Sequence, residues 1–255
     1  MDDLRDAESG ELHSLDDGSA LGAIDDTIRA TERIIEKLRS TRPVMLDQLI
    51  TDLCARCSEA ALAELSLDPI CAGIVRVGAH TPTGVPVVAL ENLGGPYGVG
   101  LQRVAQGVEA PYARSRVEEG DLVVSIKGTI GRVAVIPAGF RGNISGDLAR
   151  IRTSWRISPH FLSLFLSSDK GASRLRHVAG PSRTELPPRA LQRVMVPVPP
   201  PTHQDRVVAV MTAIDDRMAA ESAAADKLRL IRSGLAADRP SWSVKLSARI
   251  GPTGR

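Results

Sequence analysis

A seventeen-residue pattern occurs twice in this sequence and constrains how the chain can fold. Residues 23–39 read AIDDTIRATERIIEKLR, and residues 213–229 read AIDDRMAAESAAADKLR. AIDD and KLR recur at the same offset, without a gap between the copies. Two unrelated amphipathic helices would share a periodicity but not these identical residues. The repeat therefore indicates an internal duplication.

In both copies, most positions that recur at alternating spacings of four and three are apolar. This heptad seam predicts a helix that buries one narrow face against another helix. We expect the first helix over residues 21–53 and the second over residues 202–238. The apolar seam residues are Ile24, Ile28, Ile35, Leu38, Met45 and Leu49 in the first helix, and Ile214, Met218, Ala225, Leu228 and Leu235 in the second.

Three segments interrupt or flank these helices. Pro43 is expected to kink the first helix, because proline lacks a backbone donor and disfavours helix at the residue before it. Residues 1–20 carry seven acidic residues and one basic residue without hydrophobic periodicity, which predicts a disordered acidic arm. Residues 239–255 lose the heptad pattern and are predicted to be a loosely ordered tail.

Within residues 54–201, residues 70–157 change to short β-like runs punctuated by Gly and Pro, followed by one helical run at 159–178. A hairpin loop is expected over 128–131, between the second and third runs. This pattern predicts one α+β domain between the two helices. The predicted strands cover residues 86–90, 122–127, 132–137 and 148–152.

Charge is segregated along the chain although the net charge is only +2. Residues 70–200 carry sixteen Lys or Arg against eight Asp or Glu, whereas residues 1–69 are acidic overall. A basic segment between two helices is typical of a nucleic-acid-binding module on a structural scaffold. A basic face that binds an acidic protein, with the helices as an interaction scaffold, is the alternative interpretation.

No sequence pattern in the chain indicates catalysis, a cofactor or a metal. Residues 92–100 are rich in glycine but lack the GK[ST] ending of a phosphate-binding loop. Cys54 and Cys57 form a C-x-x-C pair without a second pair of ligands, so packing is the preferred interpretation. Three unpaired cysteines fit a reducing cytoplasm, and no apolar run approaches the ~18 residues that span a bilayer.

Four stretches resemble the specificity (S) subunits of type I restriction–modification systems. They are GDLVVSIKGTIGRVAVIP (120–137), GNISGDLARIR (142–152), GPSRTELPPRALQRVMVPVPPPTHQDRVV (180–208) and AIDDRMAAESAAADKLRLIRSGL (213–235). In that family these stretches form the core of a target-recognition domain, its exit loop, the entry to a spacer helix and the spacer helix itself. The repeat at 23–53 corresponds to a second spacer helix.

The resemblance implies a non-catalytic, cytoplasmic DNA reader whose two long helices pack as an antiparallel coiled coil. Each recognition domain of the family reads half of a bipartite double-stranded DNA sequence. The helices bind DNA methyltransferase (M) subunits and, through them, the restriction (R) subunit. The assembled complex is a DNA adenine methyltransferase and ATP-dependent endonuclease. No cofactor is implied for this subunit.

This chain departs from the family pattern because it has both helices but one recognition domain. The order helix–domain–helix fits a half-length subunit that forms a homodimer to rebuild two half-sites. It also fits a truncated, degenerate fragment. The sequence leaves both alternatives open.

Polar residues in the loops of the basic domain are the candidate DNA contacts. Base reading needs amide and guanidinium groups, whereas phosphate contacts need cations, hydroxyl groups and open backbone. They lie in the glycine-rich loop, the predicted hairpin, the GNIS turn and the G-P-S-R loop. The candidates are Asn92, Tyr97, Lys127, Gly128, Thr129, Arg132, Arg141, Asn143, Ser145, Ser182 and Arg183.

Overall fold

The computed structural model describes residues 3–95, 97, 100–180 and 185–237. These residues form two compact units. The helical unit combines residues 1–41 with residues 213–255, and the central unit is formed by residues 42–212. None of the helices in the described ranges is both long and apolar enough to cross a membrane.

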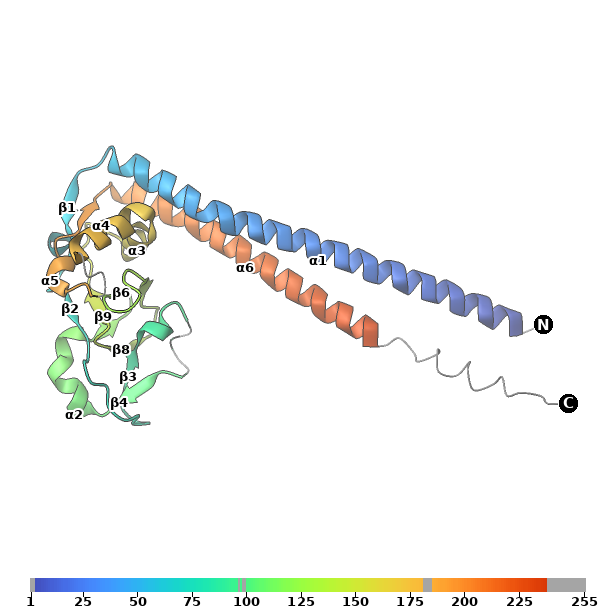
Figure 1. The fold of residues 1–255 in the computed structure, drawn as a ribbon, viewed down its shortest axis with the longest axis horizontal. Helices are drawn as coiled ribbons and strands as arrows, with labels where there is room; N and C mark the ends of the chain where they lie inside the picture. Colours follow the sequence, from blue (N-terminus) through green and yellow to red (C-terminus); the bar gives the residue numbers. More distant parts are fainter. Residues whose placement is uncertain (1–2, 96, 98–99, 181–184, 238–255) are drawn as a thin grey trace. The chain divides into compact units, whose positions relative to one another are not determined.

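Two long helices run through both units, α1 (Asp3–Cys54) and α6 (Pro201–Ala237) (Figure 1). α1 begins at Asp3, so residues expected to form a disordered arm are helical from that position. Adding residues to an existing helix gains one backbone bond for each residue fixed, and avoids the cost of nucleation. α1 also continues through Pro43, where a kink was expected, without a break in its helical assignment. The predicted tail over 239–255 lies outside the described residues.

The helical unit confirms the predicted antiparallel pairing of the two helices. Arg229 of α6 bonds Glu32 of α1 at 2.6 Å, and Arg232 bonds Asp25 at 2.5 Å. The residue nearer the C-terminus of α6 therefore pairs with the residue nearer the N-terminus of α1, as in antiparallel helices. Most predicted seam residues in this unit are buried or half-buried: Ile24, Ile28, Ile35 and Leu38 on α1, and Ile214, Met218, Ala225 and Leu228 on α6.

Two seam predictions are wrong. Leu235 is 43% exposed. Leu235 lies one turn beyond Arg232, the last residue of α6 with an ion pair to α1 among those described, so the seam does not bury it. Met45 is 38% exposed, and the neighbouring Leu46 is buried instead. Leu49 is half-buried as expected.

The central unit contains one two-stranded and two four-stranded sheets. The two-stranded sheet pairs β1 (Glu59–Ala61) with β10 (Met195–Pro197). The first four-stranded sheet has the order β2 (Cys71–Ala72), β9 (Leu148–Ile151), β6 (Leu122–Ser125), β7 (Val133–Val135). The second has the order β4 (Gln102–Val104), β3 (Val85–Val88), β8 (Arg141–Ile144), β5 (Val117–Glu118).

All pairings in these sheets are antiparallel except that of β3 with β8, which is parallel. The helices of the unit are short. They are α2 (Gln106–Glu109), α3 (Pro159–Ser167), α4 (Asp169–Ala179) and α5 (Pro188–Leu191), with the 3-10 helices η1 (Leu62–Leu65), η2 (Leu90–Asn92) and η3 (Ala110–Ser115). Together with the long helices, they confirm the predicted α+β class.

The four predicted strands are confirmed as β3, β6, β7 and β9, but the predicted helix over 159–178 is two helices. Ser168 is extended between α3 and α4, and its hydroxyl accepts a hydrogen bond from the Gly171 amide at 3.2 Å. A Cβ atom at Gly171 would lie 2.0 Å from the Phe165 carbonyl oxygen. The chain can turn this closely only because residue 171 has no side chain.

One core cluster joins the two four-stranded sheets. Val123 and Leu148 come from the first sheet, and Val88, Val117 and Ile144 come from the second. The same cluster includes residues of the connecting loops, namely Leu93, Leu101, Ile136 and Phe140. The glycine-rich segment and the loop that precedes Arg141 are therefore fixed to the core at these apolar positions.

Candidate nucleic-acid interface

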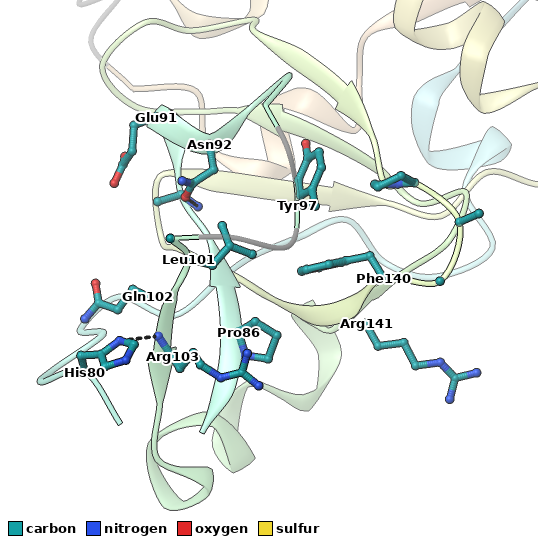
Figure 2. A pocket seen from close by; sticks show the side chains of 15 residues that line it. His80, Pro86, Glu91, Asn92, Tyr97, Leu101, Gln102, Arg103, Phe140 and Arg141 are labelled. Carbon is teal, nitrogen blue, oxygen red and sulfur yellow. Dashed lines mark hydrogen bonds between the residues drawn. The ribbon is translucent and has the colours of Figure 1, made fainter. Parts of the chain in front are cut away.

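The second four-stranded sheet and its loops surround an open cavity of about 1010 Å³, called here the larger cavity (Figure 2). Three candidate contacts, Asn92, Tyr97 and Arg141, lie on its wall. A smaller cavity of about 700 Å³ shares Pro86 and Arg141 with it. Both cavities are larger than one side chain, and the mainly polar wall of the larger cavity suits a hydrated ligand surface more than a small apolar molecule.

The glycine-rich segment forms one side of the larger cavity. The Asn92 side-chain oxygen accepts a hydrogen bond from the Ala89 amide at 2.9 Å, so this end of the side chain closes the turn of η2. Tyr97 is half-buried, not fully exposed as expected, and its ring lies 5.5 Å from that of Phe140. Burial raises the pKa of Tyr97. Both residues shape the wall of the cavity.

The predicted hairpin between β6 and β7 is confirmed. Its loop is closed by buried Ser125, whose hydroxyl accepts from the Arg132 amide at 2.8 Å and donates to the Thr129 carbonyl. Gly128 has a φ of +66°, which glycine adopts without strain. Gly128 and Thr129 are exposed at the tip of this loop.

Arg132 is exposed, but its guanidinium is already used. Its Nη1 and Nη2 groups donate to the carbonyl oxygens of Leu90 and Leu93 at 3.3 and 3.0 Å. These bonds join the hairpin to the glycine-rich segment. Arg132 therefore positions two candidate loops relative to each other.

Lys127 contacts the segment that begins at residue 185. Its Nζ atom lies 3.4 Å from a Glu185 carboxylate oxygen, and the two residues form a backbone bridge. The Leu186 amide also donates to the Ile126 carbonyl at 2.8 Å. Residues 185–186 therefore run beside residues 126–127. The candidates Ser182 and Arg183 lie outside the described residues.

Asn143 and Ser145, predicted as DNA contacts in the GNIS turn, are buried and are not presented to a ligand. Asn143 lies on β8 and is fully buried. Its amide donates to Glu109 and to the Tyr112 carbonyl, and its oxygen accepts from Ser115 at 2.7 Å. Ser145 is 5% exposed.

Glu109 completes the buried site around Asn143. The Arg116 guanidinium donates to both of its carboxylate oxygens at 2.6 and 2.7 Å. These bonds hold the pKa of Glu109 below its usual value although burial opposes the shift. The group fixes α2 and η3 to β8 and so has a structural role.

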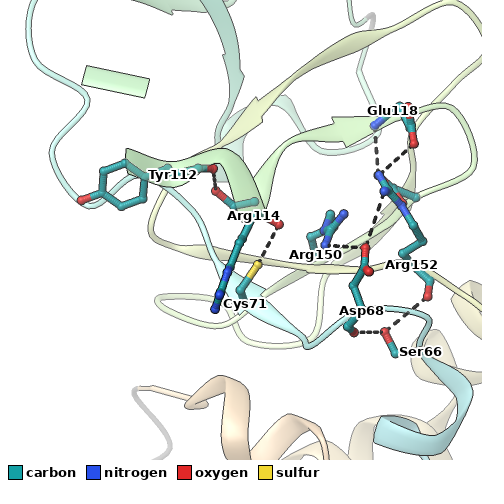
Figure 3. Close-up of polar contacts among 10 residues, drawn as sticks. Ser66, Asp68, Cys71, Tyr112, Arg114, Glu118, Arg150 and Arg152 are labelled. Carbon is teal, nitrogen blue, oxygen red and sulfur yellow. Dashed lines mark hydrogen bonds and ion pairs between the residues drawn. The ribbon is translucent and has the colours of Figure 1, made fainter. Parts of the chain in front are cut away.

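A second ionic network neutralises further arginines (Figure 3). Arg152 donates to both oxygens of buried Asp121 at 2.8 Å and lies 3.0 Å from Glu118. Arg150, almost fully buried, bonds Asp68 at 3.1 Å. These contacts join β2, β5, β6 and β9 and their flanking loops, and they raise the pKa of Arg152 further, through Asp121 first.

Ion pairing reduces the number of basic side chains that are available to bind an anionic ligand. Among the described residues of 70–200, five basic side chains are in ion pairs: Arg116, Lys127, Arg150, Arg152 and Arg174. Arg141 is exposed on β8 without an ion pair to any described residue. Among the predicted contacts on the larger cavity, Arg141 is therefore the cation that remains available to an anionic ligand.

His80, Gln102 and Arg103, which were not among the predicted contacts, also line the larger cavity. Gln102 and Arg103 belong to β4, a three-residue strand between buried Leu101 and Val104. Two polar residues between two buried apolar residues were the signal for an edge strand, and the run was too short to be recognised.

Cys54 and Cys57 are free and half-exposed. Burial raises the pKa of the Cys54 thiol, which disfavours the thiolate that metals bind. Within the described ranges, no group of three or more His, Cys, Asp or Glu side chains is placed to hold a metal ion.

Comparison with known proteins gives this geometry a context. No protein-family model matches the chain. Over 147 residues, 55% of this chain, it is 29% identical to the type I restriction enzyme EcoBI specificity subunit of Escherichia coli. The chain is a homologue of type I specificity subunits. The matched region is 30% of the length of the EcoBI subunit.

Solved structures of type I specificity subunits share the fold. The HsdS subunit of Thermoanaerobacter tengcongensis matches with a TM-score of 0.56 and 16% identity, over 85% of this chain and 55% of that one. The S subunit of M. genitalium matches with a TM-score of 0.55 and 17% identity, over 85% and 57%. This chain therefore spans little more than half the length of either structure.

Proposed function

We propose that this chain is a non-catalytic, cytoplasmic DNA-recognition subunit of a type I restriction–modification complex. The similarity to the EcoBI specificity subunit over 147 residues carries the proposal. The paired long helices and the basic central unit supply the two parts that such a subunit needs. One part sets the geometry of the complex, and the other binds double-stranded DNA.

The central unit reads one half of a bipartite DNA sequence in this proposal. Arg132, Leu90 and Leu93 hold the hairpin beside the glycine-rich segment, and Lys127 and Glu185 hold residues 185–186 beside the start of the hairpin. Three segments from distant parts of the sequence thus converge. Exposed Arg141 supplies a cation, while Gly128 and Thr129 offer open backbone and a hydroxyl group.

The helical unit acts as the docking surface for DNA methyltransferase subunits in this proposal. Antiparallel ion pairs and an apolar seam make the helix pair stiff, which suits a spacer of fixed length. One recognition unit reads one half-site, so a second copy of this chain or another subunit supplies the second half-site.

Reconstitution with a methyltransferase subunit tests the proposal. The complex and each component alone are titrated with duplex DNA by fluorescence anisotropy at several salt concentrations. We expect the complex to bind one sequence preferentially, with an affinity that falls as salt rises because phosphate contacts release counterions. Binding that is insensitive to both sequence and salt would contradict DNA recognition. Binding of an acidic protein in place of DNA would support the scaffold interpretation.

A further inference from the structure

Arg103, on the edge strand β4, is held in place by the loop of residues 78–84. Its backbone amide donates to Nδ1 of His80 at 3.3 Å, and its carbonyl oxygen accepts from the Thr81 amide at 2.8 Å. Its Nε group donates to the Gly84 carbonyl oxygen at 3.0 Å. The backbone and the side chain of Arg103 are therefore both hydrogen-bonded to the same loop, and Figure 2 shows the bond to His80.

Glycine at position 84 allows this close approach. The Gly84 amide closes a turn by donating to the Thr81 carbonyl at 2.8 Å. A Cβ atom at position 84 would lie 2.1 Å from the Val104 carbonyl oxygen, so any other residue would push the loop away from β4. The Gln102 side chain adds a further tie by donating to the Gly78 carbonyl at 2.7 Å. The loop covers the open edge of β4 and restricts the Arg103 side chain.

Because Nε of Arg103 is already hydrogen-bonded, Nη1 and Nη2 are the groups of its guanidinium that can donate to a ligand. Nη1 and Nη2 of Arg103 have no hydrogen-bond or ion-pair partner among the described residues, and Arg103 lines the larger cavity. With Nε occupied, a ligand meets the guanidinium end-on, through two parallel donors. A ligand edge with two adjacent acceptors matches this geometry, and guanine presents O6 and N7 in this way in the DNA major groove.

The restricted mobility of the Arg103 side chain also favours base reading over a simple phosphate contact. The half-buried Arg103 side chain is already restrained, so little conformational entropy is lost when it binds. A restrained fork discriminates between base edges, because a wrong edge cannot be accommodated by reorienting the side chain. Arg141, on the other strand beside β3, is exposed and has no comparable restraint.

We propose that Arg103 is a specificity-determining residue that reads a guanine of the half-site through Nη1 and Nη2. His80, Thr81 and Gly84 position it. This inference rests on the proposed function of the chain. It names the residue, Arg103, and the base, guanine, through which part of the half-site is read.

The test compares Arg103→Gln and Arg103→Lys with the matched control Arg189→Gln. Arg189 is exposed on α5 and has no ion pair with any described residue, so the control removes the same charge elsewhere in the central unit. Each variant is assembled with a methyltransferase subunit. Binding is measured on the preferred duplex and on duplexes in which one guanine at a time is replaced.

We expect both Arg103 variants to lose roughly 5- to 150-fold in discrimination at one guanine position, while discrimination at the other positions is kept. Arg103→Lys retains the charge and the aliphatic chain, so it reports on the fork geometry even if Arg103→Gln fails to fold. The control is expected to keep the full sequence preference.

An equal loss of affinity on every duplex would assign Arg103 to a phosphate and overturn the inference. Unchanged binding by both Arg103 variants would overturn it as well, with the proposed function left intact. If the unmodified complex shows no sequence preference, the proposed function itself fails, and the inference falls with it.

Discussion

The Arg132 guanidinium donates from Nη2 to the carbonyl oxygen of Leu93 at 3.0 Å and ties the β6–β7 hairpin to the glycine-rich segment. Arg132 and Leu93 are 39 positions apart in the sequence, so this bond joins two segments that are not sequence neighbours. The larger cavity depends on this bond because Asn92 and Tyr97, beside Leu93, form part of its wall.

Replacement of Arg132 by Gln is expected to loosen the glycine-rich segment. Two hydrogen bonds from a charged donor are lost at an exposed site, so the free energy of unfolding should fall by about 1–2 kcal/mol. Hydrogen exchange of the residue 90–95 amides should accelerate, as measured by mass spectrometry. Arg189→Gln is the control for loss of one positive charge. Equal exchange in both variants would show that Arg132 does not hold the segment.

Protonation of Glu109 is expected to weaken the central unit at acidic pH. Arg116, more than Asn143, holds the pKa of Glu109 below its ordinary value of 4.5. A carboxylate with a lowered pKa stabilises the fold above its unfolded pKa, and this contribution is lost as pH falls through the folded pKa. Glu109→Gln should therefore cost about 1–3 kcal/mol near pH 7 and progressively less below pH 4.5.

Urea unfolding of both proteins between pH 7 and pH 3 measures this difference. Glu91→Gln provides the matched control, because Glu91 is exposed. A stability difference between the unmodified chain and Glu109→Gln that does not shrink on acidification would contradict the assigned role of the carboxylate.

Gly171 is expected to tolerate no side chain. An alanine Cβ there would lie 2.0 Å from the Phe165 carbonyl oxygen and 2.7 Å from the Leu166 Cα, so the junction of α3 and α4 must shift. Gly171→Ala should destabilise the chain by about 3 kcal/mol or more. Gly22→Ala has open space within a helix and should stabilise by about 0.5–1 kcal/mol. Thermal unfolding distinguishes the two, and similar midpoints would refute this account of the junction.

Ala225 is expected to control pairing in the helical unit. It is 1% exposed, whereas its neighbour Ala224 is exposed. Ala225→Asp places an unpaired charge in the seam and should cost about 2–4 kcal/mol. Ala224→Asp should change stability by about 0.5 kcal/mol at most. Helix content against temperature, followed by circular dichroism, measures both. A loss that is equal in the two variants would contradict the assigned seam.

The sequence was sufficient to predict features that depend on local periodicity. Spacings of four and three predicted the buried face of α1 around Ile28 and that of α6 around Ala225. The same spacing failed at Met45, where Leu46 is buried. A straight helix drifts against a heptad repeat, and beyond residue 41 α1 belongs to the central unit, whose packing the repeat does not describe.

Features that depend on distant residues were not predictable. The GNIS sequence suggested a turn, yet residues 141–144 form β8, parallel to β3. A Cβ at Gly142 would lie 2.5 Å from the Pro86 carbonyl oxygen, so glycine serves close strand packing there. Asn143 is buried because Glu109 and Ser115 supply its hydrogen bonds. One sequence gives no sign that these residues meet.

Sequencing of methylated adenines tests the central claim most directly. DNA is compared from cells that produce this chain with a type I methyltransferase subunit and from cells that produce the methyltransferase subunit alone. The account predicts adenine methylation at one recurring sequence motif, present only when this chain is produced. The same methylation pattern in both DNA samples would contradict the assignment of DNA recognition to this chain.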